Sequence, residues 1–223
     1  MSQALNIHKS YLLLAHSLAK KKFGQTFPNP TVGCVLVKNN KIIAKASTGN
    51  GGRPHAEEIV LKKAGNKSFG STLYVTLEPC NHISYNGSCT DQIIRSGIKK
   101  IYIAKFDPDP RTNNQSINKL KENNINVNVG LTNEKTDILN KFFFESLRSK
   151  KPFIKVKMAI SKDQKIAWPD YSSKWISNTK SRKHSHKIRF QSQAILTTSK
   201  TIIKDNPRFT VRKKNKIIKY LPV

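Results

Sequence analysis

Four residues in two short segments have the types and the order of a catalytic zinc site. The first segment, "PHAEE", places His55 two residues before Glu57, and the second, "EPCNHISYNGSC", contains Cys80 and Cys89. One histidine and two cysteine thiolates are good zinc ligands, and a catalytic zinc site with three protein ligands keeps a fourth position open for water. The sequence therefore predicts a zinc centre of His55, Cys80 and Cys89.

The acid of the first segment would supply the proton chemistry of this centre. Zinc lowers the pKa of a bound water toward neutrality and makes it a nucleophile. Glu57 would act beside it as general acid and base without binding the metal. The order H-x-E followed by P-C is that of zinc-dependent nucleobase deaminases, which have two residues between their cysteines, whereas this chain has eight.

Other interpretations exist for each ligand taken alone. Free cysteines are often buried as small hydrophobes, and a histidine at a helix start can simply hydrogen-bond to the backbone. The combination of all four residues, with a proline before Cys80, favours zinc. Cys34 lies within the apolar run "TVGCVLV" and is expected to be a core residue.

The elements around the two segments alternate as in a layered α/β protein. A helix start is expected at His55 and another at Cys89, and helix N-termini stabilise thiolates. Strands are expected at 31–38, 41–48, 71–78, 99–106 and 125–131, and helices at 8–22, from 55, after 89, at 116–124 and at 132–149.

A domain boundary is expected near "RSKKPF", because a charge run and a proline end one helix before a new strand begins. The prediction is a zinc deaminase domain at 1–147 and a second segment at 148–223. In that segment, strands are expected at 153–160 and 193–198, with a helix at 179–190 between them. So few elements indicate an incomplete α/β domain.

The composition excludes several classes of protein. The net charge is +28, but the basic residues are dispersed and not interleaved with aromatic residues, so a nucleic-acid partner is not favoured. Three cysteines do not suggest a disulfide framework, and a reducing, cytoplasmic setting is expected. The apolar run "YLLLAHSLA" is short and is preceded by no basic region, so it predicts an amphipathic helix and neither a signal peptide nor a membrane span.

Over nearly its whole length the sequence resembles the bifunctional riboflavin biosynthesis deaminase/reductase family, the RibD family. The gap of eight residues between the cysteines is that family's spacing. The resemblance implies a cytidine-deaminase-like three-layer α/β/α domain followed by an incomplete dihydrofolate-reductase-like α/β segment. It is carried by "FPNPTVGCVLV", "GGRPHAEE", "YVTLEPCNH", "FDPDP", "KVKMAISKDQKIA", "SSKWIS" and "QAILTTSKTIIKDNPRFTVR".

The resemblance also implies the chemistry of the first domain. The family's deaminase hydrolyses the exocyclic amine of a diamino-ribosylamino-pyrimidinone 5′-phosphate and releases ammonia. His55, Cys80 and Cys89 would bind zinc, Glu57 would shuttle the proton, and Asn29 and His82 would contact substrate. The chain departs from the family in "ISYNGS", between the cysteines, and at Asn114 and Ser116, which replace glycines.

The family's reductase half uses NADPH to reduce the ribosyl group. The matching positions would contact NADP at Ala159, Trp175, Thr201 and Asp205, and substrate at Ser173, Arg189, Phe209 and Arg212. However, no G-x-G-x-x-G occurs in the sequence. The sequence therefore does not show the glycine-rich turn whose backbone N–H groups usually bind the phosphates of a dinucleotide. NADP(H) is therefore expected only if the segment is functional, and the alternative is a remnant that still covers the deaminase.

Two other functions stay open at the level of sequence. The charge suits a nucleoside or tRNA deaminase, although the cysteine gap and the second segment argue against it. The other is a non-catalytic protein that holds zinc and assembles with a separate reductase chain. A homo-oligomer is also possible, whereas a membrane partner is not expected.

Overall fold

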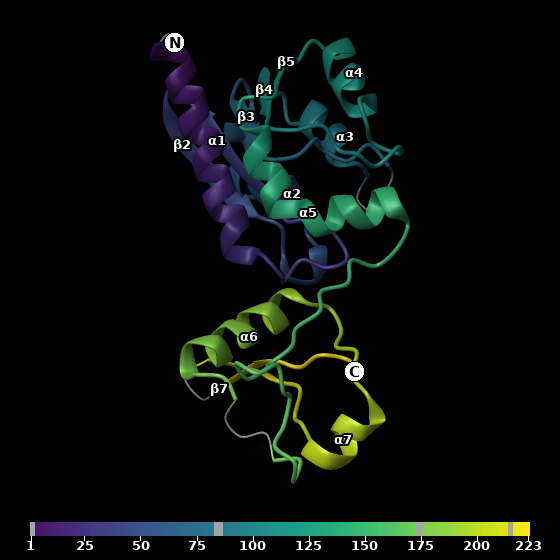
Figure 1. The fold of residues 1–223 in the computed structure, drawn as a ribbon. Coiled ribbons are helices and arrows are strands. Elements are labelled where there is room, and N and C mark those ends of the chain that lie inside the picture. Colours follow the sequence, from purple (N-terminus) through teal and green to yellow (C-terminus); the bar gives the residue numbers. More distant parts are fainter. Residues whose placement is uncertain (1–2, 83–86, 173–175, 214–215) are drawn as a thin grey trace. The chain divides into compact units, whose positions relative to one another are not determined.

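The computed structural model describes residues 3–82, 87–172, 176–213 and 216–223 (Figure 1). It divides into two compact units, Met1–Phe153 and Ile154–Val223. Each unit has its own elements and is described separately below.

A five-stranded mixed sheet forms the centre of the first unit. Its order is β2-β1-β3-β4-β5, with β1 antiparallel to β2 and β3, and β3, β4 and β5 parallel. Parallel neighbours bring the carboxyl ends of β3 and β4 to one edge of the sheet, which is where open α/β sheets bind ligands. The strands span Gly33–Lys38 (β1), Lys41–Ser47 (β2), Thr72–Val75 (β3), Lys100–Ile103 (β4) and Asn126–Val129 (β5).

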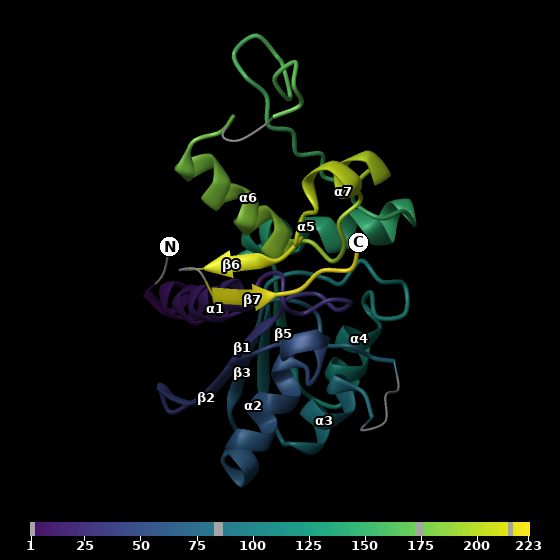
Figure 2. The same ribbon diagram turned by 90° about the horizontal axis from the view of Figure 1, so that it is seen from below.

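Helices cover both faces of this sheet and complete the expected three-layer α/β/α arrangement (Figure 2). The helix α1 packs on one face, and α2, α3 and α4 pack on the other. The helices span Gln3–Lys22 (α1), Ala56–Ala64 (α2), Cys89–Arg95 (α3), Gln115–Glu122 (α4) and Asn133–Ser149 (α5), with short 3-10 turns at Asn50–Gly52 (η1) and Gly65–Ser68 (η2). No helix in the described part of the chain is long and apolar enough to cross a membrane.

Alternate side chains of β1 point into two apolar cores, one on each face of the sheet. Cys34 and Leu36 point to the core under α2, whereas Val35 and Val37 point to the core under α1. Gly33 lets α1 approach the sheet, because a Cβ at this position would lie 1.9 Å from the Ala15 carbonyl oxygen. The predicted core position of Cys34 is correct, and the sheet is fixed from both sides.

The second unit contains two helices and a two-stranded sheet. They are α6 (Thr179–Gln191), α7 (Ser199–Asp205), β6 (Val211–Lys213) and β7 (Lys216–Lys219), and β6 and β7 pair antiparallel (Figure 2). The strands expected at 153–160 and 193–198 are wrong, since neither segment pairs with another strand among the described residues. Alternating apolar residues would lie on one face of an extended segment. A strand also needs a neighbouring strand that hydrogen-bonds to its backbone N–H and C=O groups.

A buried hydrogen bond joins α1 to the start of α5 in the first unit. His16 Nε2 lies 3.0 Å from Thr132 Oγ1, and the His16 side chain is 7% exposed. Its Nδ1 has no hydrogen-bond partner within the described ranges. Burial, assisted by the nearby Lys135 charge, lowers the pKa of His16 to about 4. The folded protein therefore holds this imidazole neutral.

We predict that His16 makes the first unit less stable in mild acid. The unfolded chain takes up a proton near the ordinary histidine pKa of about 6.5, whereas the folded protein does so only near pH 4. Stability is therefore fully present above pH 6.5 and is lost as the pH falls toward 4. Between pH 7 and pH 5, the unfolding free energy of His16→Gln should fall by about 2 kcal/mol less than that of the parent protein. Urea unfolding at pH 7 and at pH 5 measures the unfolding free energy of each protein. An equal fall in the variant and the parent would contradict the prediction.

Candidate metal centre

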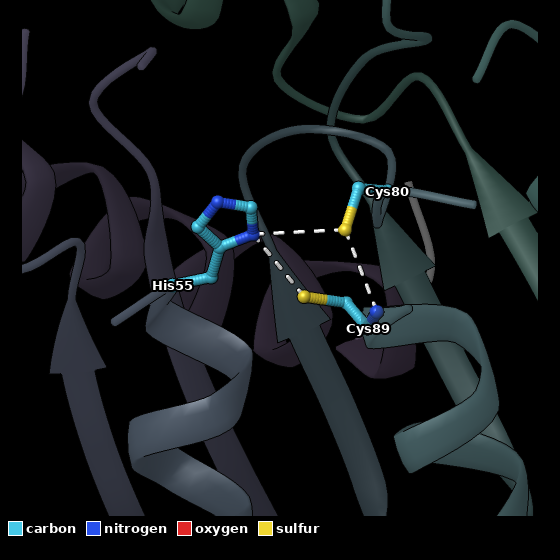
Figure 3. Close-up of side chains that lie close together, drawn as sticks. All are labelled: His55, Cys80 and Cys89. Carbon is cyan, nitrogen blue, oxygen red and sulfur yellow. Dashed lines mark hydrogen bonds between the residues drawn. The ribbon is translucent and has the colours of Figure 1, made fainter. Parts of the chain in front are cut away.

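Three side chains converge at the carboxyl end of β3 (Figure 3). His55 precedes α2, Cys80 follows β3, and Cys89 is the first residue of α3. His55 Nδ1 lies 3.3 Å from Cys89 Sγ and 3.6 Å from Cys80 Sγ, and the three ligand atoms lie within 4.8 Å of one another. The structure thus brings together the three residues predicted to bind zinc.

The spacing of these atoms fits a zinc ion. With Zn–N and Zn–S bonds of about 2.0 and 2.3 Å, a tetrahedral ion separates nitrogen from sulfur by roughly 3.6 Å. The two observed nitrogen–sulfur distances are 3.3 and 3.6 Å. One nitrogen and two sulfur donors also form a set that zinc prefers over the hard, oxygen-bound cations.

The protein stabilises negative charge on Cys80, whereas the hydrogen bond to Cys80 and burial raise the pKa of Cys89. Hydrogen bonds from the Cys89 side chain, from His55 and from the Cys89 backbone N–H lower the pKa of Cys80 to about 4. The Cys89 N–H lies 3.4 Å from Cys80 Sγ, at the N-terminus of α3. Burial opposes the charge on His55, but its hydrogen bond to Cys80 raises the pKa of His55. The surrounding protein thus favours a thiolate at Cys80.

Local hydrogen bonds fix the two helix starts that carry His55 and Cys89. The His55 N–H donates to Glu58 Oε2 over 2.6 Å, which satisfies one of the free donors at the start of α2. Ser88 caps α3 by accepting the Asp91 N–H over 3.0 Å. These caps orient the ligands through the backbone.

Glu57 lies in the first turn of α2, two residues after His55, and is 4% exposed. Burial raises the pKa of Glu57 to about 7, although the nearby His55 opposes the shift. A carboxyl group whose pKa lies near neutrality can both accept and donate a proton at that pH. Its chemistry therefore suits the predicted role of proton shuttle.

Asn29 lies beside the outer nitrogen of His55. Its Nδ2 donates to the Gly52 carbonyl over 2.9 Å and is 3.2 Å from His55 Nε2. Gly52 permits this approach, because its φ is +85° and a Cβ would lie 2.8 Å from Asn29 Cβ. Asn140 holds the same loop by accepting the Thr31 N–H over 2.8 Å.

A segment after β4 also borders the centre, although its residues were not predicted as site residues. Asp107 and Asp109 are buried, and burial raises the pKa of Asp107 to about 7 with a smaller influence from Cys80. Asp109 binds the Arg111 guanidinium through both carboxylate oxygens, which lowers the pKa of Asp109. The paired acids in "FDPDP", directly after a buried strand, are the sequence signal for this segment.

The structure accommodates Asn114 and Ser116, the two positions at which the resemblance implies glycine. Asn114 adopts the left-handed conformation at φ 60°, which asparagine tolerates better than most residues. The Ser116 hydroxyl donates to Glu78 Oε1 over 2.7 Å. Both substitutions therefore fit the backbone, and Ser116 adds a buried hydrogen bond.

The remaining predicted residues are placed only in part. His82 is half-buried, and its Nδ1 has no hydrogen-bond partner in the described part of the chain. Ser173 and Trp175 lie outside the described residues, as do residues 83–86 of the "ISYNGS" loop. The Arg212 N–H donates to His186 Nδ1 of α6 over 3.2 Å, and burial together with the Arg212 charge lowers the pKa of Arg189 on the same helix. Ala159, Thr201 and Phe209 are half-buried, and Asp205 is exposed.

Two family models match the chain in order. Residues 5–105 match the cytidine and deoxycytidylate deaminase zinc-binding region, and residues 152–219 match the RibD C-terminal domain. The first match contains all three cysteine and histidine ligands, and the second falls largely within the second unit. The chain is thus similar to a deaminase followed by a RibD-type domain.

Similar proteins combine the same two parts. The riboflavin biosynthesis protein RibD of Aquifex aeolicus is 46% identical over 206 residues, which are 92% of this chain and 58% of that protein. The Thermotoga maritima diaminohydroxyphosphoribosylaminopyrimidine deaminase/5-amino-6-(5-phosphoribosylamino)uracil reductase matches with a TM-score of 0.85 and 38% identity, over 95% of this chain and 61% of that one. RibD of Acinetobacter baumannii matches with a TM-score of 0.88 and 31% identity, over 97% and 60%. The chain spans about three-fifths of the length of these relatives.

We predict that zinc binding depends on Cys89 and not on Cys34. Cys89→Ala removes one of three ligands and should weaken zinc binding by more than about tenfold. Cys34→Ala is the matched control, because Cys34 is equally buried but belongs to the sheet core. Elemental analysis after dialysis should find one zinc per chain in the parent and in Cys34→Ala, and little in Cys89→Ala. Equal zinc contents in the two variants would contradict the assignment.

Proposed function

Because the chain belongs to the RibD family of riboflavin biosynthesis proteins, we propose that its first unit is a zinc-dependent deaminase. The proposed substrate is a diamino-ribosylamino-pyrimidinone 5′-phosphate, and the reaction is hydrolysis of its exocyclic amine. The observation that carries the proposal is the convergence of His55, Cys80 and Cys89 beside the buried Glu57.

The proposed mechanism assigns a separate task to each residue. His55, Cys80 and Cys89 would hold zinc, which when bound lowers the pKa of the attacking water. Glu57 accepts the proton of that water on its carboxylate and later donates it to the departing amine. A carbon–oxygen bond forms, the carbon–nitrogen bond breaks, and ammonia leaves. The pKa of Glu57, near 7, allows both transfers without a large energetic penalty.

Asn29 and His82 are proposed to contact the substrate. The position of the Asn29 amide, 3.2 Å from His55 Nε2, supports a place beside the reacting ring. The half-buried His82 follows Cys80 by two residues and has a buried nitrogen without a partner in the described part of the chain. The net charge of +28 would attract a phosphorylated substrate at long range.

The second unit is proposed to be part of a reductase domain that uses NADPH. The match to the RibD C-terminal domain supports this, and the proximity of Arg189 and Arg212 supports an anionic substrate. The proposed residues are Ala159, Trp175, Thr201 and Asp205 for NADP, and Ser173, Arg189, Phe209 and Arg212 for substrate. The boundary between the two activities, at 147/148, stays a prediction.

We further propose that reduction needs additional polypeptide to cover this unit. Ile154, Val156 and Leu196 are 74%, 78% and 97% exposed, although they lie in segments with apolar character. Isoleucine, valine and leucine are among the residues most often buried in folded proteins, and exposed apolar patches mark interaction sites. A separate reductase chain or a second copy of this chain would supply the cover. A cytoplasmic location is proposed because the three cysteines are free thiols.

We predict that Glu57→Gln keeps zinc and loses activity. Glutamine preserves the shape of the side chain but cannot accept a proton, so ammonia release should fall about a hundred- to ten-thousandfold. Coupled detection of ammonia from the pyrimidinone phosphate measures the rate, and elemental analysis measures zinc. Zinc without turnover in the parent protein would favour a non-catalytic partner of a reductase. Turnover of cytidine or tRNA in place of the pyrimidinone would favour the alternative deaminases.

We also predict that this chain alone does not oxidise NADPH. When the part of the Aquifex aeolicus relative that this chain does not span is added as a separate polypeptide, NADPH oxidation with the deaminated product should appear. Absorbance of NADPH at its near-ultraviolet maximum follows the reaction. Oxidation by the chain alone would contradict the need for additional polypeptide.

A further inference from the structure

We propose that Glu78 is a positioning residue for the deamination, because its buried carboxylate holds the 106–116 segment against the metal centre. Glu78 lies two residues before Cys80 and is 3% exposed. The kinetic part of this inference rests on the proposed function. The attachment of the segment to Glu78 can be measured without any substrate.

One carboxylate fastens both ends of the segment. Glu78 Oε2 accepts the Asp107 N–H over 3.1 Å and the Asn114 N–H over 3.3 Å. Glu78 Oε1 accepts the Ser116 hydroxyl over 2.7 Å. These donors oppose the rise that burial causes in the pKa of Glu78, and hydrogen bonds to an ionised carboxylate are stronger than neutral ones. A segment of eleven residues is thereby closed onto a single side chain.

The interior of the segment is tied to this anchor by a series of hydrogen bonds. Asp107 Oδ1 accepts the Asp109 N–H over 3.0 Å. Asp109 Oδ1 accepts the Arg111 N–H over 3.0 Å, and its carboxylate binds the Arg111 guanidinium. Release of Glu78 would therefore loosen the whole segment and not one end only.

The segment borders the metal centre without holding the ligands. The Asn81 amide, next to Cys80, donates to Gln115 Oε1 in the segment over 3.5 Å. Burial and the Cys80 charge raise the pKa of Asp107, and the Arg111 guanidinium and the His82 charge lower that of Asp109. The ligands have separate supports, since the Thr90 hydroxyl donates to the Cys80 carbonyl over 2.9 Å and the Cys89 N–H faces Cys80 Sγ. Loss of Glu78 should therefore displace a wall of the substrate site and leave zinc bound.

The test compares Glu78→Gln and Ser116→Ala with the parent protein. Glutamine keeps the size of Glu78 but replaces one acceptor oxygen with an NH₂ group, which cannot accept from the N–H groups of the segment. Amide hydrogen exchange in 106–116 should therefore become at least about tenfold faster. The Michaelis constant for the pyrimidinone phosphate should rise about tenfold, with kcat changed less than about twofold. Ser116→Ala removes one of the three donors and should change both quantities in the same direction but less. In the variant that carries both substitutions, hydrogen exchange and the Michaelis constant should each change by less than the sum of the two single effects.

Thr136→Val is the matched control. The Thr136 hydroxyl donates to the Thr76 carbonyl over 2.8 Å. Thr76 follows β3, as Glu78 does, whereas Thr136 belongs to α5 and lies outside the 106–116 segment. This variant loses one buried hydrogen bond and should be less stable, with exchange in 106–116 and the Michaelis constant unchanged.

Three results would overturn the role of Glu78. They are unchanged exchange in 106–116, loss of zinc from Glu78→Gln, and a fall in kcat with an unchanged Michaelis constant. If the parent protein releases no ammonia, the proposed function fails, and hydrogen exchange alone then decides whether Glu78 holds the segment. Should Glu78→Gln fail to fold, Ser116→Ala decides by the same two measurements.

Discussion

The pairing of β3 on both sides is the constraint on which the metal centre depends. β3 is antiparallel to β1 and parallel to β4, so hydrogen bonds fix its register at each edge. Cys80 lies beyond the end of this strand at Val75. The Glu78 N–H donates to the Lys105 carbonyl over 2.9 Å and the Thr90 hydroxyl donates to the Cys80 carbonyl, so hydrogen bonds continue from the sheet to Cys80. The other two ligands come from helix starts whose N–H groups lie near the same edge. The sheet and two helix N-termini thus hold the three ligands close together before a metal binds.

Several features of this arrangement could be predicted from the sequence, because they depend on local chemistry. The two helix starts, the buried strand with Cys34 and the ligand set all follow from residue type and short spacing. The role of Glu78 could not be predicted in this way. Its partners Asp107, Asn114 and Ser116 lie between 29 and 38 residues later, and only the parallel pairing of β3 with β4 brings them together.

The incorrect strands of the second unit have a related cause. The segment at 153–160 alternates apolar and basic residues, which is the pattern of a half-buried strand. In the structure, no strand in the described residues pairs with it, and its apolar side chains stay exposed. Sequence periodicity describes what a segment would bury, whereas strand formation also depends on whether a neighbour is present to receive its backbone hydrogen bonds.

The distribution of acidic residues connects the fold to the chemistry. The chain has 41 basic and 13 acidic residues. Four acids are buried in the part of the chain that the structure describes, and they lie around the metal centre: Glu57, Glu78, Asp107 and Asp109. Burial costs a carboxylate its hydration, so each must be protonated or compensated. The bond to Arg111 lowers the pKa of Asp109, and hydrogen bonds oppose but do not cancel the rise that burial causes in the pKa of Glu78. The pKa values of Glu57 and Asp107 rise to about 7. The same physical penalty thus acts on all four acids, and the hydrogen bonds that each accepts decide how far its pKa moves.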